Sequence, residues 1–244
     1  MIRILIPVYN EEKNIQDCVL NTRKFLKRKP HRFYLVNDGS KDHSLEILNK
    51  LAKKNPVQVL DHKVNKGVAA ALKTGLTQIV KDGQDSDVVV VMEGDGTSNP
   101  KLLPKMISEI QNGKDVVIAS RYVKGGRYHK FPTKRLFLSK SANNLLKFLF
   151  PYPGLQDYTH FYRAYSLWVI KKAMKVHGKN LITTKYFTAN TEFLMKILTS
   201  SVIISELPFV YDYSRKKGKS GLRIGKNLKQ YFKLIFEQKI MRVR

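Results

Sequence analysis

The chain has 244 residues, and its 45 Lys plus Arg against 19 Asp plus Glu give a formal net charge of +26 at pH 7. With 43% apolar and 10% aromatic residues, its composition is that of a globular protein of one or two domains, which excludes a disordered basic tail. The single cysteine, Cys18, excludes an intrachain disulfide and a cysteine-based zinc site, and a lone thiol fits a reducing cytoplasm.

Strand-like and helix-like segments alternate through the first half of the sequence. Apolar runs predict five strands, over Ile2 to Val8, Phe33 to Val36, Val57 to Leu60, Val88 to Met92 and Val116 to Ala119. Helical patterns between them predict helices over Glu11 to Lys29, Asp42 to Leu51, Asn65 to Lys81 and from Pro100 onward. This alternation is typical of βαβ units, so we expect an α/β fold with an open, mostly parallel sheet flanked by helices.

The pattern loosens into a basic loop after Tyr122 and then resumes. We expect a helix over Thr133 to Phe150, a strand over Thr159 to Tyr165, a helix over Phe187 to Leu198, a strand over Val202 to Leu207 and a final helix over Leu222 to Met241. No internal repeat or flexible linker interrupts the chain. We therefore expect one domain over residues 1–221, followed by a basic amphipathic C-terminal helix over 222–244.

The C-terminal segment combines an apolar stripe with many cations. From Arg215 to the end there are eleven Lys or Arg and one acid, Glu237. Such a helix fits an anionic membrane surface, to which each cation adds about 1 kcal/mol, but the stripe can equally pack on the sheet or on a partner subunit. No stretch approaches the roughly 20 apolar residues that cross a bilayer, and the N-terminal apolar run is too short for a signal peptide. Any membrane contact is therefore expected at the surface.

Acids follow three of the predicted strands, although the chain is otherwise poor in acids. The three strand ends carry Pro7, Tyr9 and Glu11; Asn37 and Asp38; and Glu93, Gly94 and Asp95. Ligands of open parallel sheets bind beyond the carboxyl ends of the strands. Glu93 and Asp95 are spaced to hold Mg²⁺ or Mn²⁺ together with phosphate oxygens. The simpler alternative is that Asp95, Thr97 or Ser98 caps the helix that Pro100 opens, but the position after a buried strand favours a metal.

Two other strand-end residues allow two interpretations each. Asp38 either accepts hydrogen bonds from a nucleobase or ribose, or forms an Asx turn into the next helix. Tyr9 either stacks on a base or packs at the strand end. Neither residue decides the function alone.

Five short motifs in a fixed order give the sequence a resemblance to a known family. They are IPVYNEE at 6–12, NDGS at 37–40, N-x-G at 65–67, EGDG at 93–96 and SRY at 120–122. The series resembles family 2 glycosyltransferases with the GT-A nucleotide-sugar fold. Arg121, Arg135 with Ser139, and DYTHFYRAY at 157–165 resemble the dolichyl- and polyprenyl-phosphate sugar synthases, typified by dolichol-phosphate mannosyltransferases. The resemblance covers roughly residues 4–222.

The resemblance implies a role for each matching residue. Nucleotide-sugar binding falls to Pro7, Tyr9, Glu11, Val36, Asp38, Gly94 and Asp95. The metal site for Mg²⁺ or Mn²⁺ falls to Glu93, Asp95 and Thr97. Acceptor phosphate binding falls to Arg121, Arg135 and Ser139, with Arg215 or Lys219 substituting for a lysine that the synthases often have at position 221. The catalytic set is Asp95, Arg121, Arg135 and Ser139.

The implied reaction is an inverting transfer of a sugar to dolichyl or polyprenyl phosphate. An anionic lipid phosphate attacks the anomeric carbon without a general base, and arginine forks suit its oxygens. The implied partners are a nucleotide sugar (GDP-mannose or UDP-glucose), the lipid phosphate and an anionic membrane surface, with an integral membrane protein as a further candidate. The implied location is the cytoplasmic face of a membrane.

The sequence departs from the family pattern at several positions, which leaves the sugar and the acceptor open. Glu93 stands where the family has aspartate, Thr97 replaces a glutamine, and Asn37 replaces an acid. Tyr158 to Phe161 replaces a Pro-Thr-Ser-Gly type of segment.

Two alternatives remain at this point. A family 2 transferase with a sugar hydroxyl acceptor needs a carboxylate base, and Glu192 is the candidate. A nucleic-acid-binding protein would fit the charge, but no helix-turn-helix, zinc or RNA-recognition motif accompanies it, so we expect no nucleic-acid partner.

Overall fold

The computed structural model describes residues 1–26, 29–218 and 224–243, and in this part of the chain helices and strands alternate as expected. The strands are β1 (Ile2–Val8), β2 (His31–Asp38), β3 (Val57–His62), β4 (Val88–Val91), β5 (Val116–Ser120), β6 (Arg127–His129), β7 (Arg163–Ser166), β8 (Ile204–Pro208) and β9 (Val210–Asp212). The α-helices are α1 (Ile15–Leu26), α2 (Ser44–Lys54), α3 (Val68–Asp82), α4 (Leu103–Gln111), α5 (Thr133–Leu149), α6 (Leu167–His177), α7 (Thr188–Ile197) and α8 (Ile224–Val243). Short 3₁₀ helices cover Pro100–Leu102, Gly178–Asn180 and Tyr213–Arg215.

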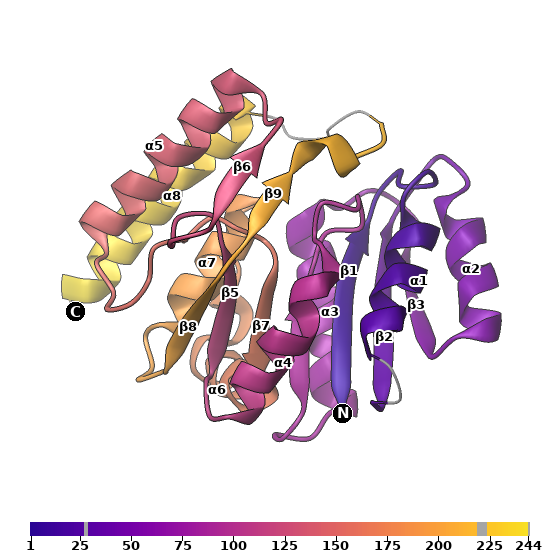
Figure 1. The fold of residues 1–244 in the computed structure, drawn as a ribbon. Helices are drawn as coiled ribbons and strands as arrows, with labels where there is room; N and C mark the ends of the chain where they lie inside the picture. The colour runs from indigo at the N-terminus through magenta and orange to yellow at the C-terminus, as the bar shows by residue number, and fades with distance from the viewer. Residues whose placement is uncertain (27–28, 219–223, 244) are drawn as a thin grey trace.

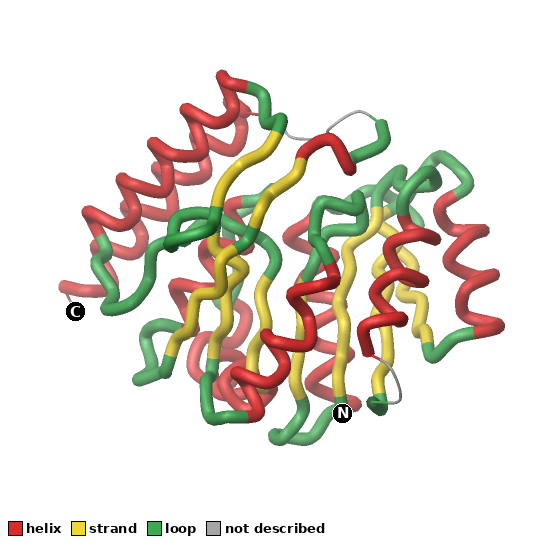
Figure 2. Tube along the Cα trace, in the orientation of Figure 1, coloured by secondary structure: helices red, strands yellow, loops and turns green. Residues whose placement is uncertain are grey.

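Seven of the described strands form one sheet in the order β3-β2-β1-β4-β7-β5-β8 (Figures 1 and 2). Its neighbours are parallel except at β7, which runs antiparallel to both β4 and β5. β6 and β9 form a separate parallel pair. The expected open, mostly parallel α/β sheet is confirmed. The chain turns from β1 to β2 on one side and to β4 on the other, so the carboxyl ends of these strands frame a crevice.

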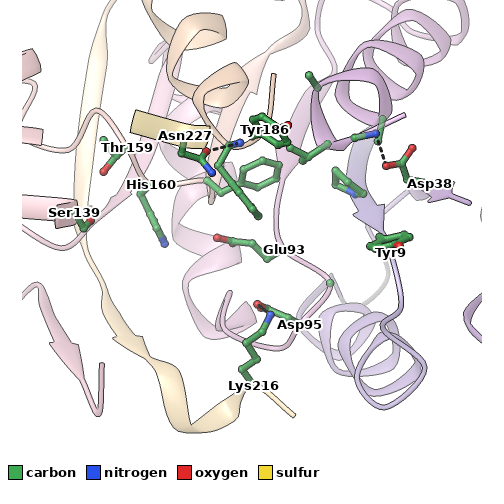
Figure 3. A pocket seen from close by; sticks show the side chains of 18 of the residues that line it. Tyr9, Asp38, Glu93, Asp95, Ser139, Thr159, His160, Tyr186, Lys216 and Asn227 are labelled. Atoms are coloured by element: carbon green, nitrogen blue, oxygen red, sulfur yellow. Dashed lines mark hydrogen bonds and ion pairs between the residues drawn. The ribbon is translucent and has the colours of Figure 1, made fainter. Parts of the chain in front are cut away.

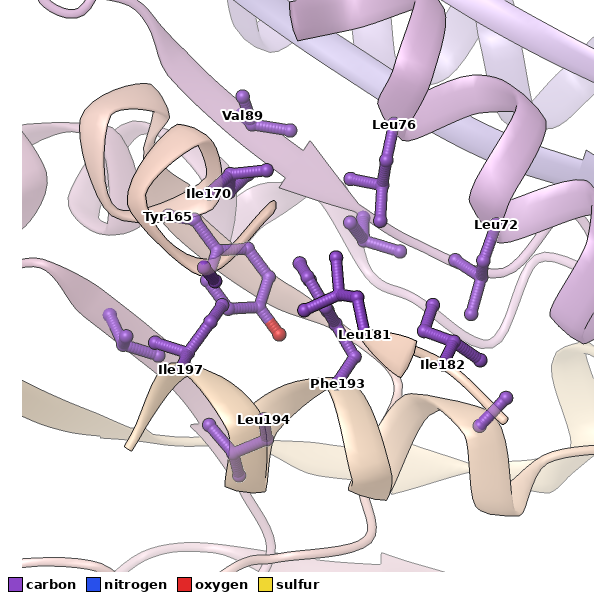
Figure 4. Close-up of a cluster of buried hydrophobic side chains, with 14 of the residues drawn as sticks. Leu72, Leu76, Val89, Tyr165, Ile170, Leu181, Ile182, Phe193, Leu194 and Ile197 are labelled. Carbon is purple, nitrogen blue, oxygen red and sulfur yellow. The ribbon is translucent and has the colours of Figure 1, made fainter. Parts of the chain in front are cut away.

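Alternating side chains of the strands build one core on each face of the sheet. Ile4 and Ile6 of β1 pack with α1, α2 and α4, whereas Leu5 packs on the opposite face with α3. Figure 4 shows this second core, where Leu72 and Leu76 of α3 meet Tyr165 of β7 and the side chains of α7. Burial on both faces explains why the central strands are almost purely apolar.

The structure differs from the sequence expectations mainly after residue 122. The strand expected over Thr159 to Tyr165 begins only at Arg163, because the preceding residues turn around the buried Asp157, which accepts the backbone N–H of Thr159 and of His160. Helix α6 and the short strands β6 and β9 were not anticipated. β6 and β9 have three residues each, too few for a period to be read.

Helices α5 and α8 lie side by side at one end of the molecule (Figure 1). Leu234 of α8 is fully buried in the same core as Leu146 of α5. Side chains at 232 and 236, on the other side of α8, are exposed. One face of the C-terminal helix thus packs internally, as one of the two sequence interpretations proposed, and another faces outward. None of the helices in the described ranges has the length and hydropathy needed to span a bilayer.

Candidate functional site

A cavity of about 700 Å³ opens beyond the carboxyl ends of β1, β2 and β4. Its wall brings together ten of the residues predicted from the sequence: Pro7, Tyr9, Glu11, Asp38, Glu93, Gly94, Asp95, Arg121, Arg135 and Ser139. Figure 3 shows Tyr9 and Asp38 on one side, Glu93 and Asp95 in the middle, and His160 and Ser139 on the other side. The cavity therefore places the predicted nucleotide, metal and acceptor residues in that order.

Two carboxylates in the middle of the cavity, Glu11 and Asp95, face one lysine, and Glu93 lies close enough to Asp95 to interact with it electrostatically. The Nζ of Lys216 lies 2.6 Å from Asp95 Oδ2 and 3.8 Å from Glu11 Oε1. Burial by itself lowers the pKa of Lys216, but the contact with Asp95 outweighs it, so the pKa is raised and the ammonium stays charged. Burial, reinforced by Asp95, raises the pKa of Glu93. Among the described residues, no three acidic, histidine or cysteine side chains are grouped so that they alone could hold a metal ion. The oxygens of Glu93 and Asp95 are nevertheless of the kind that a hard divalent ion takes together with phosphate oxygens of a ligand.

Hydroxyl groups on the following turn hold the two central carboxylates in place. The backbone N–H and Oγ1 of Thr97 donate to Asp95 Oδ1 over 3.1 and 2.5 Å. Ser98 Oγ donates to Glu93 Oε2, and the Glu93 N–H donates to Ser98 Oγ over 3.1 Å. Thr97 is fully buried outside the cavity lining, so it orients Asp95 rather than presenting its own oxygen as a metal ligand.

Asp38 ties a neighbouring loop to the rim of the cavity. Its two oxygens accept the N–H groups of Lys66 and Gly67 over 2.9 and 2.7 Å, and His62 Nδ1 lies 2.9 Å from Oδ1. Gly39 permits this packing, because its φ is +66° and a Cβ there would lie 2.4 Å from the Asn65 nitrogen. Asp38 thus shapes the cavity wall that residues 65–67 form, a role that the sequence interpretation did not include. Val36, predicted to contact the nucleoside, is fully buried in the core instead.

The predicted acceptor arginines differ in their surroundings. Arg121 is buried, and its Nε and Nη2 donate to Asp157 over 2.8 and 2.6 Å, with Nη2 also 2.7 Å from Thr159 Oγ1. Burial alone would raise the pKa of Asp157, but Arg121 holds it well below its usual range. This ion pair fixes the guanidinium in the wall and neutralises its charge.

Arg135 and Ser139 both project from α5 into the cavity wall. Arg135 Nη1 donates to the Tyr213 hydroxyl over 2.8 Å. Ser139 Oγ lies 3.0 Å from the Tyr128 hydroxyl, which lies 2.9 Å from that of Tyr122. The spacing of four residues on one helix explains why both side chains reach the same side.

Glu192, the candidate base for a hydroxyl acceptor, is a buried anchor. Its oxygens accept four hydrogen bonds of 2.7 to 2.8 Å, from the backbone N–H and the hydroxyl of both Thr183 and Thr184. It lies outside the cavity lining, whereas the loop that it anchors supplies Lys185, Tyr186 and Phe187 to the wall. This geometry favours a structural role over proton transfer.

The late loop and the DYTHFYRAY segment contain two site residues that the sequence interpretation missed. Arg215 is exposed outside the lining, and Lys219 lies outside the described residues, whereas the neighbouring Lys216 enters the acid cluster. His160 also lines the cavity. The available signals were the run of three cations at 215–217 and the departure of 158–161 from the family pattern.

Apolar side chains also line the cavity on the side toward α5 and α8. It includes Leu138 and Ala142 of α5, Tyr231 of α8, Phe161 and Phe187. The rings of Phe161 and Phe187 lie 6.3 Å apart in an edge-on arrangement. The cavity therefore offers one charged half and one half suited to an apolar group.

Comparison with known proteins places this site in a family. Residues 3–173 match the sequence model of glycosyl transferase family 2. The chain is 30% identical over 235 residues to a dolichol-phosphate mannosyltransferase of Pyrococcus furiosus, covering 96% of this chain and 62% of the relative. It is 29% identical over 229 residues to a polyprenol monophosphomannose synthase of Mycolicibacterium smegmatis, covering 93% and 82%. The chain thus spans less than two thirds of the Pyrococcus relative.

Solved structures agree on the fold. A glucosyl-3-phosphoglycerate synthase of Mycobacterium tuberculosis, solved with Mn²⁺, UDP and glucosyl-3-phosphoglycerate, superposes with a TM-score of 0.67. The identity is 16%, and the match covers 96% of this chain and 77% of that one. With the family model matching more than half of the chain, the protein belongs to glycosyl transferase family 2 and is a glycosyltransferase.

Proposed function

We propose that the protein transfers a sugar from a nucleoside diphosphate sugar to a polyprenyl or dolichyl phosphate, with inversion at the anomeric carbon. The observation that carries this proposal is the division of the cavity into an acidic centre, a basic side and an apolar wall. Each part matches one part of the two substrates. The relatives named for dolichol-phosphate and polyprenol products support the same acceptor class.

The donor half of the cavity holds the nucleoside and the diphosphate. Tyr9 offers a ring to the base, and the 65–67 loop that Asp38 anchors closes the rim. Glu93 and Asp95 are the residues that would hold Mg²⁺ or Mn²⁺, with Lys216 beside them. A divalent cation there supplies charge neutralisation for the departing nucleoside diphosphate.

The acceptor half holds the lipid phosphate and the start of its chain. Arg135 and Ser139 offer donors to phosphate oxygens, and the buried ion pair of Arg121 with Asp157 makes the wall behind them rigid. The apolar residues of α5 and α8 give the first isoprene units a dry surface. Because the phosphate is already anionic, no proton has to be removed for attack, which agrees with the engagement of Glu192 elsewhere.

For the donor we propose GDP-mannose, with UDP-glucose as the alternative. Two relatives carry mannose in their names, whereas a third, from Methanococcus voltae, is named for transfer of N-acetylglucosamine from its UDP donor. We further propose that the protein acts at the cytoplasmic face of a membrane, where α5 and α8 meet the lipid, with an integral membrane protein as a candidate partner.

The test is a product assay with the full chain, Mn²⁺ or Mg²⁺, and GDP-mannose, UDP-glucose or UDP-N-acetylglucosamine, each with polyprenyl phosphate or an oligosaccharide acceptor. We expect a glycolipid with one donor, and its loss when EDTA removes the metal. Arg135→Ala should lower kcat/KM for lipid phosphate by about 10- to 100-fold and leave donor binding intact, because it removes a charge-assisted hydrogen bond. Lys134→Ala, at the exposed neighbouring position, is the matched control. Transfer to the oligosaccharide alone contradicts the proposal.

A further inference from the structure

His160 carries a hydrogen-bond acceptor that the fold leaves unused in the cavity wall. The side chain is 2% exposed, and its Nδ1 lies 2.6 Å from the carbonyl oxygen of Ala119. Because a carbonyl only accepts, Nδ1 must carry the proton, and Nε2 must present a lone pair. Within the described residues, no polar atom pairs with this buried Nε2.

The ring is held so that neither rotation nor protonation satisfies Nε2. It packs against Phe209 and Tyr211, with ring centroids 4.9 and 5.5 Å away. The backbone of His160 is also fixed, since its N–H donates to Asp157 and its carbonyl accepts from Asn190. Burial, together with the nearby Arg121, lowers the pKa of His160 to about 3, so the ring is neutral at physiological pH. A buried acceptor without a donor is costly, which marks Nε2 as the place for a ligand group.

The position of His160 selects the kind of ligand group. In Figure 3 it lies across the cavity from Tyr9 and Asp38, with Glu93 between them. A nucleotide sugar with its base near Tyr9 and its diphosphate near Glu93 and Asp95 reaches this side with its sugar. Fully ionised phosphate oxygens have no proton to donate to a lone pair, whereas a sugar hydroxyl has one.

We infer that Nε2 of His160 accepts a hydrogen bond from one hydroxyl of the transferred sugar and thereby helps to select that sugar. This inference rests on the proposed function, because it presumes a nucleotide-sugar donor. His160 would act here as a specificity-determining residue and not as a general base, because its low pKa makes it a poor proton acceptor. The sugar hydroxyl that donates to His160 can be identified, because its removal from the donor should lower kcat/KM as much as the removal of Nε2 does.

The test combines His160→Asn with donors that each lack one sugar hydroxyl. An asparagine amide can still donate to the Ala119 carbonyl but has no atom at the Nε2 position. We expect wild-type kcat/KM to fall by about 10- to 100-fold for one monodeoxy analogue of GDP-mannose or UDP-glucose. His160→Asn should show the same loss with the complete donor and no further loss with that analogue. Affinity for GDP or UDP alone, measured by calorimetry, should be unchanged.

The outcomes separate the inference from the proposed function. If His160→Asn loses as much affinity for the nucleoside diphosphate as for the complete nucleotide sugar, the sugar contact is overturned. The same conclusion follows if the loss of kcat/KM from His160→Asn adds to the loss from every deoxy analogue. A wild-type protein that binds no nucleotide sugar overturns both proposals. In case His160→Asn does not fold, ¹⁵N NMR of the wild-type histidine rings gives a second readout. The His160 Nε2 signal should shift upfield with the nucleotide sugar and stay in place with the nucleoside diphosphate, and an unmoved signal in both cases overturns the inference.

Discussion

Each acidic side chain of the cavity is held by donors from its own neighbourhood before any ligand arrives. Thr97 fixes Asp95, Ser98 fixes Glu93, and the Asp38 oxygens are engaged by the loop at 66–67. The carboxylates are thus pre-positioned, so ligand binding costs little side-chain entropy. The remaining cost is electrostatic, since burial and the nearby Asp95 both disfavour the ionised form of Glu93 and raise its pKa.

That cost makes the stability of the metal-free protein depend on pH. Burial and Asp95 raise the pKa of Glu93 above its ordinary value of 4.5, so the folded state binds this proton more tightly than the unfolded state. The protonated Glu93 therefore stabilises the folded state. This contribution to the free energy of unfolding is complete at pH values below the ordinary pKa and is lost as the pH rises through the raised pKa. Mn²⁺ favours the ionised form, so the gain in Tm on adding it should grow over about pH 5 to 8.

Glu93→Gln should flatten this pH dependence and weaken Mn²⁺ binding by about tenfold or more. Scanning calorimetry across the pH range, with and without MnCl₂, measures both effects. Glu109→Gln, an acid of α4 outside the cavity, is the control. An unchanged pH profile in Glu93→Gln contradicts the assignment.

Residues next to strand ends were predictable, but contacts between distant segments were not. Glu93 and Asp95 follow a buried run of valines, and that local pattern was enough to place them at the ligand edge of the sheet. Lys216 contacts Asp95, which is 121 positions away in the sequence, and hydrophobic periodicity does not predict contacts between such distant residues. The orientation of His160 likewise depends on Ala119 of β5 and on Phe209 and Tyr211, which come from two other segments of the chain.

Among the elements, the loop before α7 is held in place mainly by one side chain, that of Glu192. Glu192 accepts from four donors of Thr183 and Thr184, and two side chains of α8, Gln230 and Asn227, accept the backbone N–H groups of Lys185 and Phe187. The loop holds Tyr186 at a φ of +57°, an unusual value for a non-glycine residue. Helices α7 and α8 therefore fix one wall of the cavity together.

Glu192→Ala should lower the free energy of unfolding by about 2 to 4 kcal/mol, because it leaves buried donors without an acceptor. Urea denaturation measures this loss. Glu192→Gln keeps the size of the side chain and should retain most transfer activity, with a smaller loss of stability. If Glu192 were the catalytic base, the glutamine variant would instead keep its stability and lose transfer. Glu46→Gln, at an exposed position of α2, controls for the loss of an acid.

The order of elements followed from hydrophobic patterning, whereas their pairing did not. The five strands of the first half were predicted because each is a mainly apolar run between polar turns. β7, with the sequence Arg-Ala-Tyr-Ser, carries no such run, and it enters the sheet antiparallel between β4 and β5. Direction and neighbours depend on which core side chains fit across the sheet, a property of the whole fold.

For the whole molecule, the excess of cations is concentrated in the second half. Up to residue 120 there are 19 Lys or Arg and 14 acids, and beyond it there are 26 and 5. The acids of the first half include the cavity carboxylates. Helices α5 and α8 carry nine of these second-half cations, and the same two helices expose Phe137, Phe148, Phe232 and Phe236. Exposed phenylalanines beside lysines are typical of a surface that enters an anionic bilayer.

We expect the full chain to co-sediment with vesicles containing anionic lipid, and less so as salt rises, because the lysines are screened. Phe232→Ser with Phe236→Ser should weaken binding by about 10- to 100-fold, since each ring contributes apolar area to the contact. Both side chains are mostly exposed, at 61% and 69%, so the fold should survive. Val176→Ser, equally exposed on α6 at 62%, is the control for loss of an apolar surface residue. Equal sedimentation of the double variant and the control would place the membrane contact elsewhere. Because Leu138 and Ala142 of the cavity wall lie on the same α5, binding through these helices would bring the cavity to the membrane surface, where the proposed acceptor phosphate would lie.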